Sequence, residues 1–117
     1  MDRAASTQSG VVAMWRQLCR VDEVPQNGMK EFTAEGGPRI LIVRTATEYR
    51  AYQADCPHQA FPLDQGIHDG SVLTCLEHLW QFDVRTGAPL GDAEAGLTAY
   101  RVKEEEGALH VWIDQGC

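Results

Sequence analysis

The sequence predicts an all-β fold, and three observations support this. Strand-like runs of five to nine residues recur along the 117-residue chain, and Gly, Pro and Asn stand between them. No segment keeps a helical period over three turns. The length suits one domain, so we expect a β-barrel or sandwich over residues 13–117, preceded by a flexible, small and polar tail at residues 1–12.

The first half of the domain contains four predicted strands. Residues 15–21 (WRQLCRV) form a first run, which is closed by Pro25 and the turn signal Asn27-Gly28. Residues 29–35 alternate and end at Gly36-Gly37-Pro38. Residues 39–45 (RILIVRT) are the most apolar run, which predicts a central strand, and residues 48–55 alternate again.

The second half repeats this pattern. Residues 71–75 and 79–84 have the spacing of two arms of a hairpin, and residues 85–96 (RTGAPLGDAEAG) are predicted as loop. Residues 97–105 and 108–114 form the last two predicted strands, separated by a turn around Gly107.

Charge and targeting signals exclude several functional classes. The formal net charge is -7, which disfavours binding to nucleic acid or to anionic membranes. The N-terminus lacks the apolar region of a signal peptide, and the longest apolar runs, such as ILIV, are too short to span a bilayer. We therefore expect a cytoplasmic protein. Its four cysteines then favour a metal or redox site over disulfides.

Two of the cysteines stand in mixed pairs with histidines. Cys56 and His58 form C-x-H, and after sixteen residues Cys75 and His78 form C-x-x-H. In an extended chain, residues i and i+2 point the same way, and Pro57 stiffens the backbone between them. Residues i and i+3 approach each other in a tight turn. Two such loops facing each other would offer two thiolates and two imidazoles to one metal centre.

Two kinds of centre accept that ligand set. Zinc is common with Cys2His2 ligands, although its sites usually draw like ligands from one knuckle. A [2Fe–2S] cluster with two cysteines on one iron and two histidines on the other is the alternative. A two-iron cluster between two loops takes one cysteine and one histidine from each loop, which is the pattern of this chain.

The motif C-x-H-x16-C-x2-H resembles the ligand motif of Rieske [2Fe–2S] proteins. The sequence around the motif, AYQADCPHQ at 51–59 and LTCLEHLWQFDVRTG at 73–87, is similar to the Rieske ferredoxins of bacterial multicomponent monooxygenases. Those systems oxidise alkenes or aromatic compounds with a diiron hydroxylase. The resemblance runs from about Met14 to the end of the chain. It implies a Rieske β-sandwich with a small cluster-binding subdomain, whose loops lie at about 55–63 and 74–82.

The resemblance also implies the site and the function. The [2Fe–2S] cluster would be held by Cys56, His58, Cys75 and His78. The chain would be a monomeric electron carrier without catalysis of its own, between an NADH-dependent flavin or iron–sulfur reductase and a diiron hydroxylase oligomer in hydrocarbon catabolism. The ferredoxin of an aromatic ring-hydroxylating dioxygenase, or a zinc-stabilised interaction module, is the alternative.

Departures from other Rieske proteins refine this expectation. Respiratory Rieske proteins carry an extra cysteine in each loop, joined as a disulfide, where this chain has Phe61 and Glu77. Trp80 stands where those proteins place a serine that hydrogen-bonds a bridging sulfide. Since hydrogen bonds to sulfur favour the reduced cluster, the resemblance implies a low-potential centre.

The remaining cysteines and histidines have simpler interpretations. Cys19 lies in an apolar run and is predicted as a core residue, and Cys117 as an incidental terminal thiol. His68 and His110 lack partners at ligand spacing and are predicted as structural or solvated. For the surface around the cluster, the sequence offers Gln59, Ala60, Phe61, Pro62, Leu76, Leu79 and Pro89, with Asp55, Asp64 and Glu77 to steer basic partners.

Overall fold

The computed structural model describes residues 13–34, 37–57, 61–76 and 79–114, and these residues contain β-strands and two short 3-10 helices. The elements, in chain order, are β1 (Ala13–Arg20), η2 (Val21–Glu23), β2 (Met29–Thr33), β3 (Arg39–Arg44), β4 (Tyr49–Gln53), η3 (Leu63–Gln65), β5 (Ile67–His68), β6 (Val72–Thr74), β7 (Gln81–Asp83), β8 (Pro89–Leu90), β9 (Ala99–Tyr100), β10 (Val102–Glu105) and β11 (Ala108–Asp114). The all-β prediction is confirmed. The predicted tail at 1–12 lies outside the described residues.

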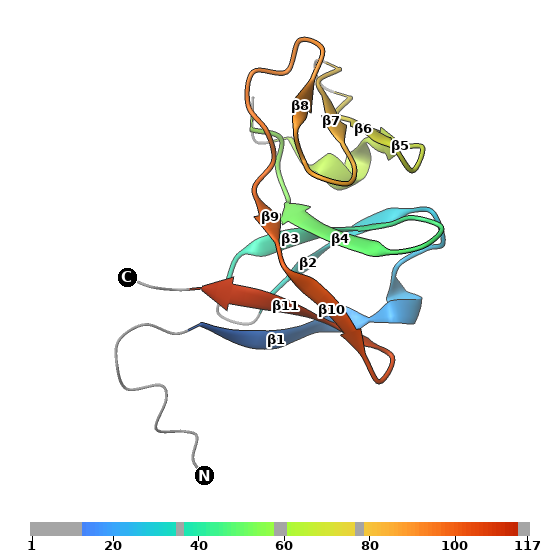
Figure 1. The fold of residues 1–117 in the computed structure, drawn as a ribbon, viewed down its shortest axis with the longest axis vertical. Helices are drawn as coiled ribbons and strands as arrows, with labels where there is room; N and C mark the ends of the chain where they lie inside the picture. Colours follow the sequence, from blue (N-terminus) through green and yellow to red (C-terminus); the bar gives the residue numbers. More distant parts are fainter. Residues whose placement is uncertain (1–12, 35–36, 58–60, 77–78, 115–117) are drawn as a thin grey trace.

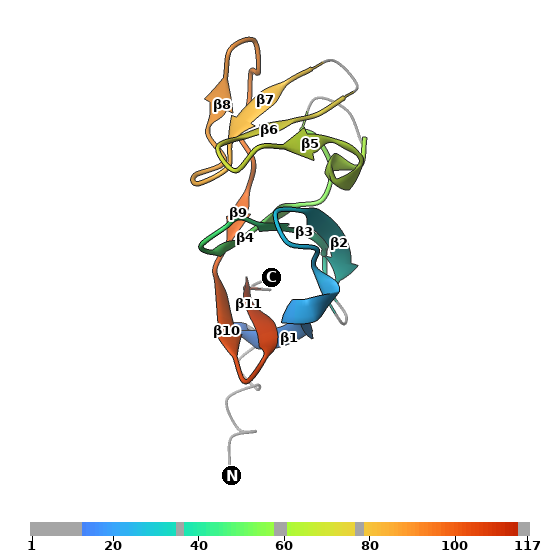
Figure 2. The same cartoon turned by 90° about the vertical axis from the view of Figure 1, so that its right-hand side faces the viewer.

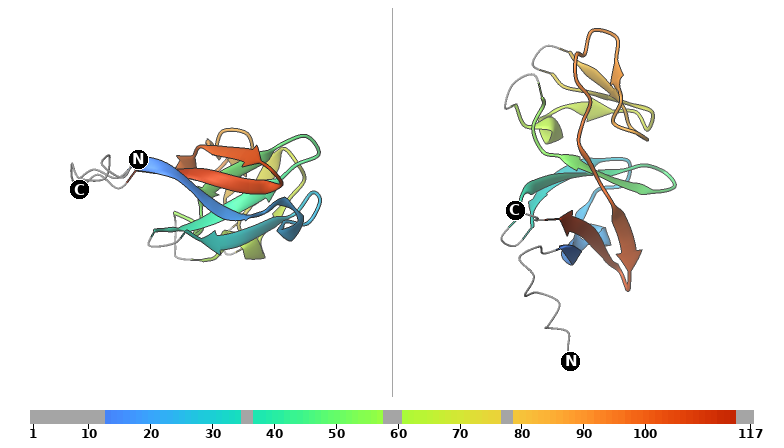
Figure 3. Two further views of the ribbon diagram at one scale, coloured as in Figure 1. Left: turned by 90° about the horizontal axis from the view of Figure 1, so that it is seen from below. Right: turned by 60° about the vertical axis from the view of Figure 1, so that its left-hand side comes forward.

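The strands form three antiparallel sheets, which follow one another along the long axis of the molecule (Figures 1 and 2). The lower sheet has the order β1-β11-β10, the middle sheet β2-β3-β4-β9 and the upper sheet β5-β6-β7-β8. The first and last strands pair from Ala13↔Asp114 onward, so the two ends of the described chain lie side by side (Figure 3).

Strand β3 of the middle sheet is buried on both faces, which explains why residues 39–45 form a continuous apolar run. Ile40 and Ile42 pack with residues of the lower sheet, whereas Leu41 and Val43 pack with residues of the upper sheet. All four side chains are fully buried. A strand covered on both faces needs apolar residues at successive positions rather than at every second one. The prediction that this strand is central is confirmed.

Side chains from the end of β4 fasten the upper sheet to the middle sheet. The buried Tyr52 hydroxyl donates a 2.6 Å hydrogen bond to the carbonyl of Val84, next to β7. The Gln53 side chain accepts from the Thr98 amide and donates to the Asp55 carbonyl, at 2.8 Å in both cases. Gln53 therefore joins the chain segment that leaves the middle sheet to the segment that returns to it.

His68 makes a second connection between the layers. Its Nδ1 accepts a hydrogen bond from the Gly70 amide at 3.0 Å, so Nε2 carries the proton and donates to the Gly28 carbonyl at 3.1 Å. Gly28 precedes β2 in the middle sheet, and His68 belongs to β5 in the upper sheet. Of the two roles predicted for His68, structural or solvated, the structure shows the structural one.

Two predictions about the C-terminal half are wrong. Residues 97–105 are not one strand, because the chain pairs with β4 up to Tyr100 and with β11 from Val102 onward. Arg101 is the corner at which it changes sheets. The predicted loop 85–96 contains the short strand β8, and β5 was not predicted at all. Strands of two residues are too short to show a period in the sequence.

Candidate metal centre

Two loops of the upper layer begin with the predicted cysteine ligands and close in the same way. The Cys56 amide donates to the Phe61 carbonyl at 3.0 Å, and the Cys75 amide donates to the Trp80 carbonyl at 2.8 Å. Each bond joins a cysteine to the residue five positions later. We call segments 56–61 and 75–80 the twin loops.

Both cysteines of the twin loops are buried in one hydrophobic cluster. Cys56 is 5% exposed and Cys75 is 1% exposed, and both are free of disulfides. Leu63, Leu73 and Phe82 belong to the same cluster. A thiolate is costly in apolar surroundings unless a cation compensates its charge, and bound iron would supply that charge. This donor set fits a centre that takes one thiolate from each loop.

The two predicted histidine ligands, His58 and His78, lie outside the described residues, as does Glu77. Within the described residues, no group of three or more His, Cys, Asp and Glu side chains could hold a metal ion. The full ligand set of Cys56, His58, Cys75 and His78 therefore stays a prediction, and its described half consists of the two buried cysteines.

The first twin loop is anchored on both sides. Asp55 forms an isolated antiparallel bridge with Pro62, and the Leu63 amide donates to the Ala54 carbonyl at 2.8 Å. The Asp55 carboxylate accepts two hydrogen bonds from Arg39, each 2.9 Å long. Contacts with the middle sheet therefore fix the backbone that leads into Cys56.

The second twin loop connects β6 to β7, which confirms the predicted hairpin. Trp80 packs edge-on against Phe82 with ring centroids 6.4 Å apart, so its ring lies partly within the core. Leu76 and Leu79 are 47% and 65% exposed, although both are large and apolar. Leu79 also has a positive φ of 61°, which is uncommon for leucine. The loop thus buries its cysteine and presents apolar side chains to solvent.

Sequence reasoning missed the residues that support this site from a distance. Arg39, Tyr52 and Gln53 hold the twin loops or the upper sheet from the middle sheet. Their partners are remote in sequence or belong to the backbone, and no local pattern indicates them. The prediction for Cys19 is confirmed, since it lies in the core between the lower and middle sheets.

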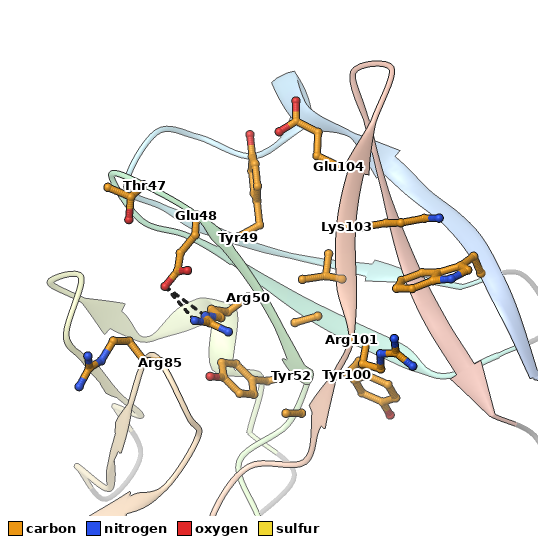
Figure 4. A pocket seen from close by; sticks show the side chains of 14 residues that line it. Thr47, Glu48, Tyr49, Arg50, Tyr52, Arg85, Tyr100, Arg101, Lys103 and Glu104 are labelled. Carbon is orange, nitrogen blue, oxygen red and sulfur yellow. Dashed lines mark hydrogen bonds and ion pairs between the residues drawn. The ribbon is translucent and has the colours of Figure 1, made fainter.

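A separate groove of about 700 Å³ lies between β4 and the β9–β10 segment (Figure 4). The described residues that line it include none from the twin loops. Three of its cations have partners: Arg50 bonds Glu48 at 3.0 Å and 3.2 Å, and Arg101 and Lys103 lie 5.5 Å and 4.5 Å from the centre of the Trp15 ring. We assign this groove no part in metal binding.

The helices of the described residues, η2 and η3, have three residues each, and neither could span a bilayer.

Comparison with known proteins identifies the family. The Rieske [2Fe-2S] domain matches residues 14–101. The methanesulfonate monooxygenase ferredoxin subunit of Methylosulfonomonas methylovora is 35% identical over 100 residues, which cover 85% of this chain and 80% of the relative. The ferredoxin component of the alkene monooxygenase system of Xanthobacter autotrophicus (strain Py2) is 33% identical over 93 residues, covering 79% and 75%.

Solved structures agree with this result. The ferredoxin of carbazole 1,9a-dioxygenase from Nocardioides aromaticivorans IC177 matches with a TM-score of 0.76 and 26% identity, over 84% of this chain and 96% of that one. The resemblance inferred from the motif is therefore confirmed. The chain belongs to the Rieske [2Fe-2S] domain family, and its cofactor is a [2Fe–2S] cluster.

Proposed function

We propose that this protein is a one-electron carrier, a Rieske ferredoxin of an oxygenase system, whose cluster is held by Cys56, His58, Cys75 and His78. The observation that carries the proposal is the pair of buried, unbridged cysteines at equivalent positions of the twin loops. A histidine follows each of them at the spacing of the family motif. The names of the relatives, which are ferredoxin components of oxygenase systems, support the same function.

When bound by two thiolates and two neutral imidazoles, a [2Fe–2S] cluster takes up one electron at roughly -150 to +300 mV. The chain would keep water from the cysteine side of the site, because both thiols are buried. The exposed Leu76 and Leu79 would form part of a small apolar docking surface, which suits an encounter that must release quickly. No catalytic residue is needed for this role, so we propose a carrier rather than an enzyme.

For the partners, we favour an NADH-dependent flavin or iron–sulfur reductase as donor and a diiron hydroxylase as acceptor, in the cytoplasm. The alkene and methanesulfonate monooxygenase relatives support a monooxygenase system. The match to a dioxygenase ferredoxin favours the second candidate, an aromatic ring-hydroxylating dioxygenase. Turnover supported by the purified chain with one hydroxylase of each kind would distinguish the two acceptors.

The first test is EPR spectroscopy of the dithionite-reduced protein, with iron and sulfide assayed on the same sample. We expect a rhombic signal with an average g below that of four-cysteine clusters, and about two irons and two sulfides per chain. Cys56→Ser and Cys75→Ser should abolish the signal, whereas Cys19→Ser, at a buried cysteine of the other core, should keep it. A colourless, EPR-silent protein that contains zinc would contradict the proposal.

A further inference from the structure

Arg39 opens β3, and its guanidinium joins two carboxylates from different parts of the chain. Nε and Nη2 donate to Glu31 at 2.6 Å and 3.0 Å, and Nη1 and Nη2 donate to Asp55 at 2.9 Å each. Donating these hydrogen bonds to the Glu31 and Asp55 carboxylates raises the pKa of Arg39, so its charge is permanent. The planar fork of arginine suits such paired contacts, and lysine cannot reproduce them.

Asp55 connects Arg39 to the metal centre, because it is the residue directly before Cys56. Its backbone bridges Pro62, the residue directly after the first twin loop, and its carbonyl accepts from Gln53 at 2.8 Å. Only its side chain reaches Arg39. Removing the arginine would therefore release the carboxylate while the backbone contacts of Asp55 remain.

The positive and negative charges of Arg39, Glu31 and Asp55 do not cancel. Arg39 carries one positive charge, and Glu31 and Asp55 carry one negative charge each, which leaves the triad at a net charge of about -1 at neutral pH. Consecutive Cα atoms are about 3.8 Å apart, so the Asp55 carboxylate lies within roughly 10 Å of the Cys56 sulfur. This is about one Debye length at 0.1 M salt, so the Asp55 charge acts on the site with partial screening, and Arg39 lies 2.9 Å beyond that carboxylate.

We propose that Arg39 is a positioning residue for the metal centre: it anchors the first twin loop through Asp55, and its charge raises the reduction potential of the cluster bound there. Reduction adds a negative charge, which a nearby guanidinium favours and an uncompensated carboxylate opposes. The inference rests on the proposed ligand set, since it requires Cys56 to hold the cluster.

The test compares the midpoint potentials of Arg39→Gln and Arg50→Gln. Both variants lose one positive charge from an ion pair, but Arg50 pairs with Glu48 and lies opposite Val43, near the end of β3 that is far from Arg39. We expect Arg39→Gln to weaken the electron affinity of the cluster about two- to tenfold. At 59 mV per tenfold, this lowers the midpoint potential by about 20–60 mV. The shift should be larger than that of Arg50→Gln. The shift should shrink in 0.5 M salt, which is roughly a fivefold increase over 0.1 M.

Two further variants separate charge from positioning. Asp55→Asn removes a negative charge and should raise the potential more than Glu48→Gln does. Arg39→Lys keeps the charge and loses the fork, so it should stay near the wild-type potential but lose iron faster. If Arg39→Gln does not hold a cluster, the midpoint potentials of Arg39→Lys and Asp55→Asn can still be compared with that of the wild type.

The outcomes distinguish this inference from the proposed function. A wild-type protein without the Rieske EPR signal would overturn the proposed ligand set. A wild-type protein with that signal, together with equal potentials for Arg39→Gln and Arg50→Gln and equal potentials for Asp55→Asn and Glu48→Gln, would overturn the assignment of Arg39 alone.

Discussion

Buried thiols occur in both cores of this protein, and their surroundings differ. Cys56 and Cys75 start the twin loops, and the amide of each donates to the carbonyl five residues later. Cys19 lies within β1, opposite Leu109 in the register with β11, and packs against apolar side chains. Burial raises the pKa of Cys19 to about 11, with Glu23 adding to the rise, so this thiol stays protonated and unreactive at neutral pH.

That shift predicts a loss of stability at alkaline pH. An unfolded chain ionises its cysteines near pH 8.5, whereas folded Cys19 keeps its proton up to about pH 11. Between these values the unfolded state binds fewer protons than the folded state, so the free energy of unfolding falls as pH rises. Burial also raises the pKa of Tyr52 to about 12, which extends the loss beyond pH 10 by the same reasoning.

Cys19→Ala should remove the part of this loss of stability that falls between about pH 8.5 and about pH 11. Urea unfolding midpoints of the wild type and the variant, measured at pH 8, 9.5 and 10.5, should converge as pH rises, because only the wild type has the thiol to ionise. Curves that stay parallel over this range would contradict the assignment.

At the residue scale, the sequence predicts what is local. The C-x-H and C-x-x-H pairs, and the core position of Cys19, follow from neighbours in the chain. The contacts of Arg39 with Asp55 and of Tyr52 with Val84 join residues 16 and 32 positions apart. Such pairs depend on how the sheets stack, and a single sequence carries no signal for them.

At the scale of elements, the longer strands were predictable, whereas the two-residue strands β5 and β8 were not. The run at 108–114 coincides with β11, and the apolar run at 39–45 matches β3 apart from its last residue. The corner at Arg101 was missed because alternation continues across it while the pairing partner changes. The point at which β9 ends and β10 begins depends on which strand the chain pairs with, and the periodicity of the sequence carries no information about the pairing partner.

The double burial of β3 leads to a prediction with a matched control. Leu41 and Ile42 are adjacent and fully buried, but Leu41 packs in the cluster that contains Cys56 and Cys75, and Ile42 packs in the other core. Leu41→Ala and Ile42→Ala should each cost about 2–5 kcal/mol of unfolding free energy. Only Leu41→Ala should also shorten the half-life of the bound cluster.

The measurement is the rate at which visible absorbance bleaches at a temperature well below either unfolding transition. There, global unfolding is rare in both variants, and the local packing around the cysteines controls the loss of iron. Equal bleaching rates for the two variants would show that the two cores do not act separately.

At the scale of the whole molecule, the three sheets enclose two separate cores. The lower and middle sheets enclose one core, and the middle and upper sheets enclose the core that contains the cysteines of the twin loops (Figure 2). The chain carries a net charge of -7, which would steer it towards partners with basic docking sites and make association sensitive to salt.

The apolar side chains of the second twin loop should decide how tightly those partners are held. Leu76 and Leu79 are exposed on this loop, and Ile67, which is 59% exposed on β5, is a similar side chain outside the twin loops. We expect Leu79→Asn to raise the KM for the carrier about three- to tenfold in reductase and oxygenase assays, because about 1 kcal/mol of apolar contact is lost. Asparagine tolerates the positive φ at this position, so the loop should keep its shape.

The control is Ile67→Asn, which makes the same kind of change on a different surface and should leave KM unchanged. Both variants should keep the wild-type potential and EPR signal, which separates docking from any disturbance of the cluster. Since association of an acidic carrier is steered by charge at long range, salt should change the on-rate of all three proteins alike. A similar rise in KM for Ile67→Asn would mean that partners contact the upper sheet broadly, and the docking surface would then not be confined to the twin loops.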